Sequence, residues 1–379
     1  MVSNLGHSHP SIKKALINQI NSDLIFSYNY PSRLRADYLQ KLTEFVGLPY
    51  GAKCHMMSGG TESIEAAIRI CQMYGENVGK GSAIISIEGN FHGKTMGSSF
   101  LGIPGIYGRR YPEFSHYFPK VPFPYAWNPG ALNGESFFNS AIEELYKTLN
   151  VSSDVCAIFL ESFQGWGACF YPKSFVKAVE TFCKEKKILL VFDEMQAGFY
   201  RTGKKFGYNY YGVEPDLVCM GKGIGSGFPM SALIGRDYLL DLPLPGELSS
   251  TNSGNPLACA AGIATIEVMN QKGFKEDIEK KSDLFERLGN ELVANHKNLL
   301  SRSSFKGMVG AFLFYDEKEK LPLVENANKF VNICLANQLL VIRTGRESVK
   351  IAPPLSMSLE DISHAFKIFD KAIRDLIKR

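Results

Sequence analysis

The sequence predicts an α/β protein with a large, mostly parallel sheet domain and a smaller α+β domain at its C-terminus. Between about residues 53 and 235, short apolar runs alternate with amphipathic helical patterns, which is typical of a parallel sheet. After about residue 270 long helical patterns enclose a few short strands. A chain of 379 residues exceeds one small core, so we expect residues 1–25 to be a remnant N-terminal segment of the small domain, 26–270 the large domain and 271–379 the small domain.

Six runs rich in β-branched and apolar residues are the candidate strands of the large sheet. They lie at residues 54–57, 83–87, 155–160, 188–192, 217–220 and 231–234. Apolar positions three and four apart predict intervening helices at 61–74, 137–149 and 174–186. The Pro-, Tyr- and Phe-rich stretch 104–129 has neither period, so we expect a long ordered loop there.

The C-terminal part reads as two helices, two strands and a last helix. Small residues predict a helix at 257–269, and a charged amphipathic pattern predicts one at 275–295. Strands are expected at 308–314 and 339–343. Ser358, followed by two acidic residues, predicts the start of a final helix at 359–378.

Composition excludes several classes of function. The net charge of +4 is spread along the chain, which gives no reason to propose a nucleic-acid partner. No apolar run approaches the roughly 18 residues needed to span a bilayer, so we expect no membrane partner. Eight cysteines without a CxxC pair indicate reduced thiols and a cytoplasmic protein. His7 and His9 lack a third ligand, so no metal site is predicted.

The residues that follow the strands are the candidates for chemistry, because ligands of open parallel sheets bind at the carboxyl ends of the strands. Ser58-Gly-Gly-Thr61 follows the first strand and opens a helix. Its glycines allow close backbone approach and its helix N-terminus favours an anion, so it predicts a phosphate site; a plain turn with a helix cap explains the pattern equally well.

Phe91-His-Gly-Lys-Thr follows the second strand and contains the Gly-Lys-Thr end of a nucleotide P-loop. The P-loop spacing is absent, because Gly89 to Gly93 encloses three residues where four are needed, and Glu88 would repel phosphate. Phe91 at a strand end could instead stack on a flat heterocycle, although it could equally pack in a core.

An acid and a lysine end two further strands. Asp193 terminates an apolar strand, where a carboxylate is costly unless it meets a cation. Lys222 follows another apolar strand and is surrounded by glycines; desolvation would make its amine nucleophilic toward an aldehyde. A phosphate, a flat ring, a cationic ring nitrogen and an aldehyde are together the features of pyridoxal phosphate.

Nine ordered stretches make the chain resemble the class III aminotransferases of pyridoxal-phosphate fold type I. The matching stretches are residues 4–10, 58–63, 91–95, 161–165, 193–199, 201–203, 221–223, 251–256 and 352–355. The resemblance covers nearly the whole chain. It implies the fold type I architecture, with residues 26–270 as the domain that binds the cofactor.

The resemblance also implies roles for individual residues. Lys222 would hold the cofactor as a Schiff base and move the substrate proton, and Asp193 would pair with the protonated ring nitrogen. Gln196 would bind the ring hydroxyl. Phe91 and Met195 would cover the two faces of the ring.

The remaining cofactor contacts come from the strand ends and from a second subunit. Gly60 and Thr61 would bind the phosphate, and His92 and Glu161 belong to the same cofactor site. Thr251 would reach the phosphate of the neighbouring subunit, which makes a homodimer the smallest competent unit.

Substrate recognition departs from the family pattern at three positions. Members that use glutamate often carry a glutamate five positions after Glu161, where this chain has Trp166, and an arginine where it has Lys350. The arginine common after Phe-His-Gly is Lys94 here. Carboxylates could be bound by Lys94, Lys350 or Arg346, or the substrate could present none; Trp166 would then floor a stacking pocket or be an ordinary core residue.

The resemblance favours transamination between an amine or amino acid and a keto or aldehyde acceptor, by a ping-pong mechanism. Aminomutases, racemases and decarboxylases of the same family are the nearest alternatives. A non-catalytic binding protein with the same fold is an alternative of another class, although Lys222, Asp193 and Gln196 argue against it.

Overall fold

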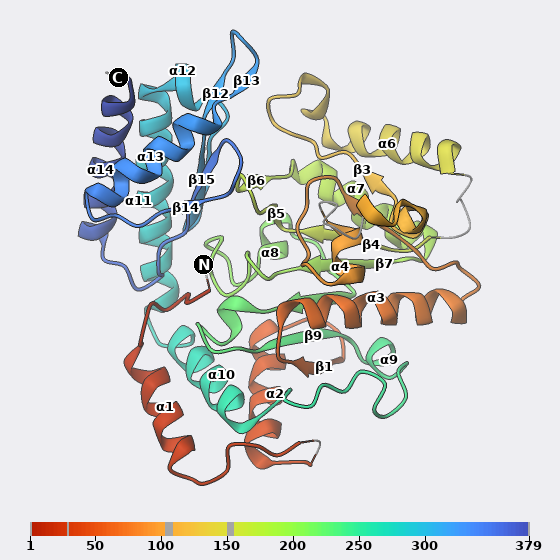
Figure 1. Cartoon of the computed structure of the whole chain (residues 1–379). Helices are drawn as coiled ribbons and strands as arrows, with labels where there is room; N and C mark the ends of the chain where they lie inside the picture. Colours follow the sequence, from red (N-terminus) through yellow and green to blue (C-terminus); the bar gives the residue numbers. More distant parts are fainter. Residues whose placement is uncertain (1, 29, 103–108, 150–154, 378–379) are drawn as a thin grey trace.

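The computed structural model describes residues 2–28, 30–102, 109–149 and 155–377 (Figure 1). The strands are β1 Ala52–Met57, β2 Ala83–Ile87, β3 Lys120–Val121, β4 Val155–Glu161, β5 Phe163–Gln164, β6 Cys169–Phe170, β7 Leu189–Asp193, β8 Leu217–Met220, β9 Ser231–Arg236, β10 Ser304–Lys306, β11 Val309–Leu313, β12 Tyr315–Asp316, β13 Leu321–Pro322, β14 Ile342–Arg343 and β15 Ser348–Ile351.

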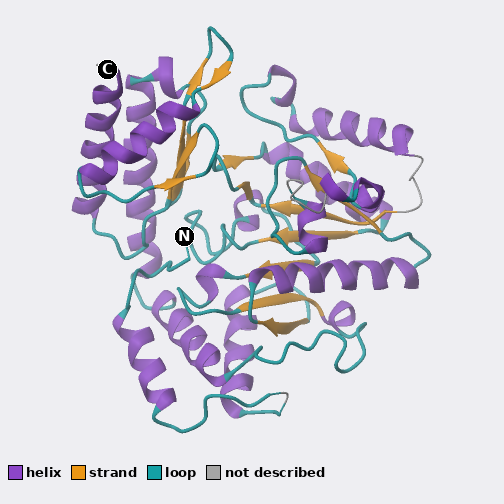
Figure 2. Cartoon of the chain, viewed as in Figure 1, coloured by secondary structure: helices purple, strands orange, loops and turns teal. Residues whose placement is uncertain are grey.

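Helices are distributed over the whole described chain (Figure 2). The α-helices are α1 Pro10–Ile20, α2 Arg33–Val46, α3 Gly60–Asn77, α4 Met96–Leu101, α6 Gly134–Leu149, α7 Lys173–Lys186, α8 Tyr208–Tyr211, α9 Asp237–Leu240, α10 Pro256–Met269, α11 Phe274–Asn295, α12 Lys297–Leu300, α13 Val324–Ala336 and α14 Leu359–Ile377. The 3-10 helices are η1 Pro112–Tyr117, η2 Pro129–Ala131 and η3 Lys222–Ile224.

The large domain is built on a seven-stranded sheet in the order β1-β9-β8-β7-β4-β2-β3. Only β9 runs antiparallel to its neighbours β1 and β8, so the other six strands share one direction. The six strands and the mostly parallel sheet expected from the sequence are confirmed, as is the α/β fold class.

Both faces of the sheet are buried, which explains why its strands read as continuous apolar runs. Along β7, Leu189 and Val191 pack with α3 on one face, whereas Leu190 and Phe192 pack with α7 on the other. Layers of helix thus exclude water from the sheet and leave the strand ends as the accessible edge.

The small domain is an antiparallel sheet in the order β10-β11-β15-β14, covered on one side by α11, α13 and α14 (Figure 1). Its core is aromatic. The rings in mutual contact are Phe285, Phe305, Phe312, Phe330, Phe366 and Phe369. The other side of the sheet faces the large domain, to which Ser348 donates a hydrogen bond at the Trp166 carbonyl (2.8 Å).

Several elements differ from the sequence prediction. The stretch 104–129, expected to be a loop, contains η1 and the edge strand β3, which pairs in parallel with β2. Residues 104–108 of this stretch lie outside the described residues. Helix α13 and strand β15 were not expected. Helix α13 has an apolar face that includes Ala327, Phe330 and Cys334, so its pattern was present in the sequence and was overlooked. Strand β15 was missed because four residues carry little periodicity.

The N-terminal residues touch both domains. Helix α1 packs against α10 of the large domain. Leu5 N–H bonds Ser226 Oγ (2.8 Å), while the Asn4 carbonyl accepts from Leu355 N–H (2.7 Å). The division at residues 25 and 270 stays a prediction. None of the described helices combines the length and hydropathy that crossing a bilayer requires.

Candidate active site

The ends of the parallel strands meet at one edge of the sheet, around Met195. A Cβ atom on Gly221, after β8, would lie 2.4 Å from the Met195 sulfur, and one on Gly60, after β1, would lie 2.8 Å from it. Met195 itself follows β7 and is buried. A side chain at either position would displace the Met195 sulfur, so the backbones that carry Gly60 and Lys222 converge here.

The Phe91-His-Gly turn lies against the N-terminus of α3. Gly93 adopts φ 144°, and a Cβ atom there would lie 2.7 Å from Thr61 Cγ2. Phe91 follows β2 and keeps 41% of its surface exposed, so its ring can meet a ligand. The helix dipole places partial positive charge at Gly60 and Thr61 in the same corner.

Asp193, at the end of β7, is a buried carboxylate with two donors. His92 Nδ1 donates to its Oδ2 (2.9 Å), and Met195 N–H donates to its Oδ1 (2.9 Å). Because the imidazole is also buried, this pair is shielded from water. A buried carboxylate at a strand end is the group needed to hold a cationic ring nitrogen.

Glu161, at the end of β4, organises the centre of the site. Its carboxylate accepts from Phe91 N–H (2.9 Å) and from Gln196 Nε2 (3.1 Å). Burial raises the pKa of Glu161 to about 7; the His92 side chain opposes this rise and Asp193 adds to it. Gln196 Oε1 in turn accepts from Lys350 Nζ (2.8 Å).

Lys222 opens the short helix η3 directly after β8. Its backbone adopts φ 41°, in the left-handed region that residues other than glycine rarely occupy. The residue is half-buried. Glycines precede and follow it. Backbone strain of this kind is concentrated at functional sites, because the surrounding structure must hold it in place.

An aromatic wall links the long loop of the large domain to the small domain. The Tyr125 and Trp127 rings stack at 4.6 Å, and Trp166 meets Tyr125 edge-on at 6.2 Å. Trp166 is 9% exposed, and the Arg346 guanidinium lies 3.7 Å from its ring centroid. Trp166 is therefore packed in the core and in contact with a cation, and its part in a substrate pocket stays a prediction.

The structure does not bring every expected residue into this cluster. Lys94 and Thr251 are exposed, the latter in a turn between α9 and α10. Gln164 was not expected, yet its Oε1 accepts from Tyr125 OH (2.6 Å) and from the Trp166 indole. Its place inside the Glu-Ser-Phe-Gln-Gly motif was the available signal.

The residues fit pyridoxal phosphate. The buried His92 Nε2 has no hydrogen-bond partner among the described residues. The Gly60 and Gly221 backbones pack against Met195, and the N-terminus of α3 begins at Gly60. An acid, an amine, an aromatic ring and an anion site thus lie at one edge of the sheet.

A family model described as aminotransferase class-III matches residues 1–373. The acetylornithine aminotransferase of Caldanaerobacter subterraneus subsp. tengcongensis is 32% identical over 379 residues, which is 99% of this chain and 88% of that one. The chain belongs to the class-III aminotransferases. Enzymes of this class depend on pyridoxal phosphate, so this is the cofactor of the chain.

Other relatives and solved structures agree with this membership. A probable 4-aminobutyrate aminotransferase of Bacillus subtilis is 28% identical, with 98% of this chain and 86% of that protein covered. A Bacillus anthracis aminotransferase structure matches with a TM-score of 0.87 at 25% identity, over 98% of this chain and 87% of the other. An acetylornithine aminotransferase structure from Elizabethkingia anophelis matches at 0.78 and 27%, over 99% and 87%.

The fold and the activity expected from the sequence are thus confirmed. This class-III aminotransferase transfers an amino group between small molecules with pyridoxal phosphate.

Proposed function

We propose that this aminotransferase moves an amino group between an amine or amino-acid donor and a keto or aldehyde acceptor, with Lys222 as the residue that holds the cofactor. The observation that carries the proposal is the convergence of Lys222, Asp193, Thr61 and Phe91 at one edge of the sheet. Pyridoxal phosphate, when bound, supplies an aldehyde for attachment of an amine and a ring that accepts electrons from the adjacent carbon.

Each residue has a distinct task in this proposal. Asp193, oriented by His92 and by the Met195 N–H, keeps the ring nitrogen protonated. Gly60 and Thr61 bind the phosphate at the start of α3. Lys222, once its amine is free, would accept the proton that leaves the amine-bearing carbon of the substrate and would return it to the carbon that was the aldehyde carbon of the cofactor.

The ring of the cofactor needs contacts on its faces and at its hydroxyl. Phe91 stacks on one face of the ring, and Met195 packs on the other. The sulfur of Met195 lies against Gly60 and Gly221, which fixes its position. Gln196, which is tied to Glu161, binds the ring hydroxyl.

A homodimer is proposed as the working unit, with Thr251 completing the phosphate site of the partner subunit. Thr251 is exposed, as a residue that reaches a second subunit would be in one chain. Exposed apolar side chains in the last part of α1 and directly after it also support a protein partner. These side chains are Ile17, Ile20, Leu24, Ile25 and Phe26. We further propose that the protein is cytoplasmic, since its eight cysteines are free.

Substrate choice is proposed to depend on the wall that contains Trp166. Relatives are named as acetylornithine and 4-aminobutyrate aminotransferases, whose substrates carry carboxylates. Lys94, Lys350 and Arg346 are the cations available to bind such a group in this chain, and Arg346 already stacks on Trp166. Lys94 is exposed, Arg346 contacts Trp166, and Lys350 donates a hydrogen bond to Gln196, so we propose a different role for each of the three.

The proposal is tested on the purified protein loaded with pyridoxal phosphate. The wild-type enzyme should show the cofactor's absorbance band, and an amino donor alone should convert it to the pyridoxamine form until a keto acid is added. Lys222→Ala should lose the covalent attachment and at least about a thousandfold in rate. A band that persists through a donor-only reaction would contradict transamination and support a racemase. A panel of donors against pyruvate and 2-oxoglutarate then identifies the substrates.

A further inference from the structure

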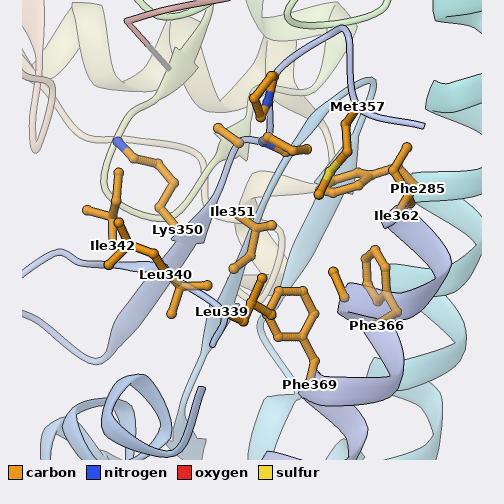
Figure 3. A pocket seen from close by; sticks show the side chains of 15 residues that line it. Phe285, Leu339, Leu340, Ile342, Lys350, Ile351, Met357, Ile362, Phe366 and Phe369 are labelled. Atoms are coloured by element: carbon orange, nitrogen blue, oxygen red, sulfur yellow. The ribbon is translucent and has the colours of Figure 1, made fainter. Parts of the chain in front are cut away.

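Lys350 reaches the active site from the small domain. It lies in the middle of β15, paired with Ala311 of β11 and Ile342 of β14. Its stem lines an apolar cavity of about 180 Å³. Figure 3 shows its amine pointing away from that cavity, while Ile351 points toward it. The sheet therefore sends the charged end of Lys350 into the large domain.

The amine of Lys350 is used in two hydrogen bonds there. Nζ donates to the Gly165 carbonyl (2.8 Å) and to Gln196 Oε1 (2.8 Å). Since an ammonium has three hydrogens, two of its donors are committed to the protein. Arg346, by contrast, is exposed, stacks on Trp166 and pairs with the carboxylate of its neighbour Glu347.

These bonds fix which end of the Gln196 amide is the donor. Lys350 can only donate, so it requires Oε1; the Glu161 carboxylate can only accept, so it requires Nε2. A Cβ atom on Gly165 would lie 2.1 Å from Gln196 Nε2, so the amide also lies tightly against the backbone. One Nε2 hydrogen remains, in a fixed direction, as a donor for an anionic oxygen.

Lys350 is also electrostatically coupled to Lys222. Burial lowers the pKa of Lys350 to about 8; the Glu161 carboxylate opposes this fall, and the Lys222 ammonium adds to it. The Lys350 amine therefore lies close enough to Lys222 for the two side chains to interact electrostatically, and it brings a positive charge to this part of the site. The charged and titratable groups around the pair come from three strand ends of the large domain. These groups are His92, Glu161 and Asp193.

We propose that Lys350 is a positioning residue of the cofactor site and not a ligand of the substrate carboxylate. It presents the Nε2 donor of Gln196 to the ring hydroxyl, and it holds a positive charge beside that amide. This inference rests on the proposed attachment of the cofactor to Lys222. A carboxylate on the substrate then meets another cation, and Arg346 is the one in contact with the aromatic wall.

The test compares three variants of the cofactor-loaded enzyme. Lys350→Met removes the charge and both hydrogen bonds, Lys350→Arg keeps the charge, and Lys329→Met removes an exposed charge from α13 of the same domain. The first readout is the pH titration of the cofactor's absorbance band. The second is the dissociation constant of pyridoxal phosphate. The third is KM for a carboxylated acceptor against an acceptor without a carboxylate, such as pyruvate against butanal.

Lys350→Met should move the spectral midpoint upward by about one pH unit, because a neighbouring positive charge is lost. It should also weaken cofactor binding by about tenfold, the equivalent of one hydrogen bond. The ratio of the two KM values should stay within about twofold of the wild-type ratio. The Lys350 amine is hydrogen-bonded to Gln196 and does not contact the substrate in this proposal, so it should not distinguish the two acceptors. The midpoint of Lys350→Arg should lie closer to the wild-type value than that of Lys350→Met, because the charge is kept. The midpoint of Lys329→Met should equal that of wild type.

An unchanged midpoint, or a KM increase confined to carboxylated acceptors, would overturn the proposal. If Lys350→Met does not fold, Lys350→Gln removes the charge with a polar side chain and is held to the same outcomes. Failure of the proposed function gives a different result: wild-type protein would form no band, and borohydride treatment with pyridoxal phosphate would leave Lys222 unlabelled.

Discussion

Replacing Arg201 by methionine should destabilise the junction between the two domains. Arg201 is fully buried and lies in the turn after β7. Its guanidinium donates to the carbonyls of Met308 (2.8 Å) and Pro353 (2.6 Å) and to Asn4 Oδ1 (3.1 Å). One side chain thus connects the large domain with the N-terminal residues and with two segments of the small domain.

The size of the effect follows from these contacts. Three hydrogen bonds from a charged group contribute about 2 kcal/mol each, or about 6 kcal/mol together. Burial lowers the pKa of Arg201 to about 10, a fall that corresponds to a cost of about 3 kcal/mol. The difference predicts that Arg201→Met loses about 3 kcal/mol of unfolding free energy.

Intrinsic fluorescence in a urea titration measures this loss. Both tryptophans of the chain report on the junction, because Trp127 lies under Arg302 and Trp166 under Arg346. The midpoint should fall by about 1 M. Arg33→Met, which removes an almost fully exposed arginine, should change the free energy by less than about 0.5 kcal/mol. A midpoint for Arg201→Met equal to that of Arg33→Met would refute the reasoning.

Two further predictions concern the centre of the site. Gly165→Ala should weaken binding of pyridoxal phosphate by about tenfold or more in a fluorescence titration, because its Cβ would displace Gln196; affinity equal to wild type would contradict the tight contact. Burial raises the pKa of Glu161 from its ordinary 4.5 to about 7 in the folded, cofactor-free protein. Between these two pH values the folded protein binds more protons than the unfolded chain, so the free energy of unfolding falls as the pH rises. Glu161→Gln should reduce the difference in urea midpoint between pH 5 and pH 8, and an unchanged difference would argue against the raised pKa.

Much of the fold could be predicted from the sequence, because the strands and helices of the large domain have characteristic patterns of apolar residues within each segment. The six long strands of the large sheet carry continuous apolar runs, and the helices between them carry a three-to-four residue period. The strand ends could be located in the same way, so Thr61, Phe91, Asp193 and Lys222 could be placed at one edge before any coordinates were known. Strand β3 was missed because a two-residue edge strand leaves little local signal. Helix α13 does carry a helical apolar period, so the sequence could have predicted it as well.

The sequence by itself therefore determined the sheet, the edge at which chemistry occurs and the cofactor that these residue types suit. Only the tertiary structure decided how the three candidate cations differ. Lys350 joins Gln196 across 154 residues of chain, Arg346 stacks on Trp166, and Lys94 stays exposed. Contacts between residues so far apart depend on how the small domain packs against the large one. No local sequence pattern encodes the packing of the two domains. It depends on hydrogen bonds between distant residues, which form only when both domains are folded and in contact.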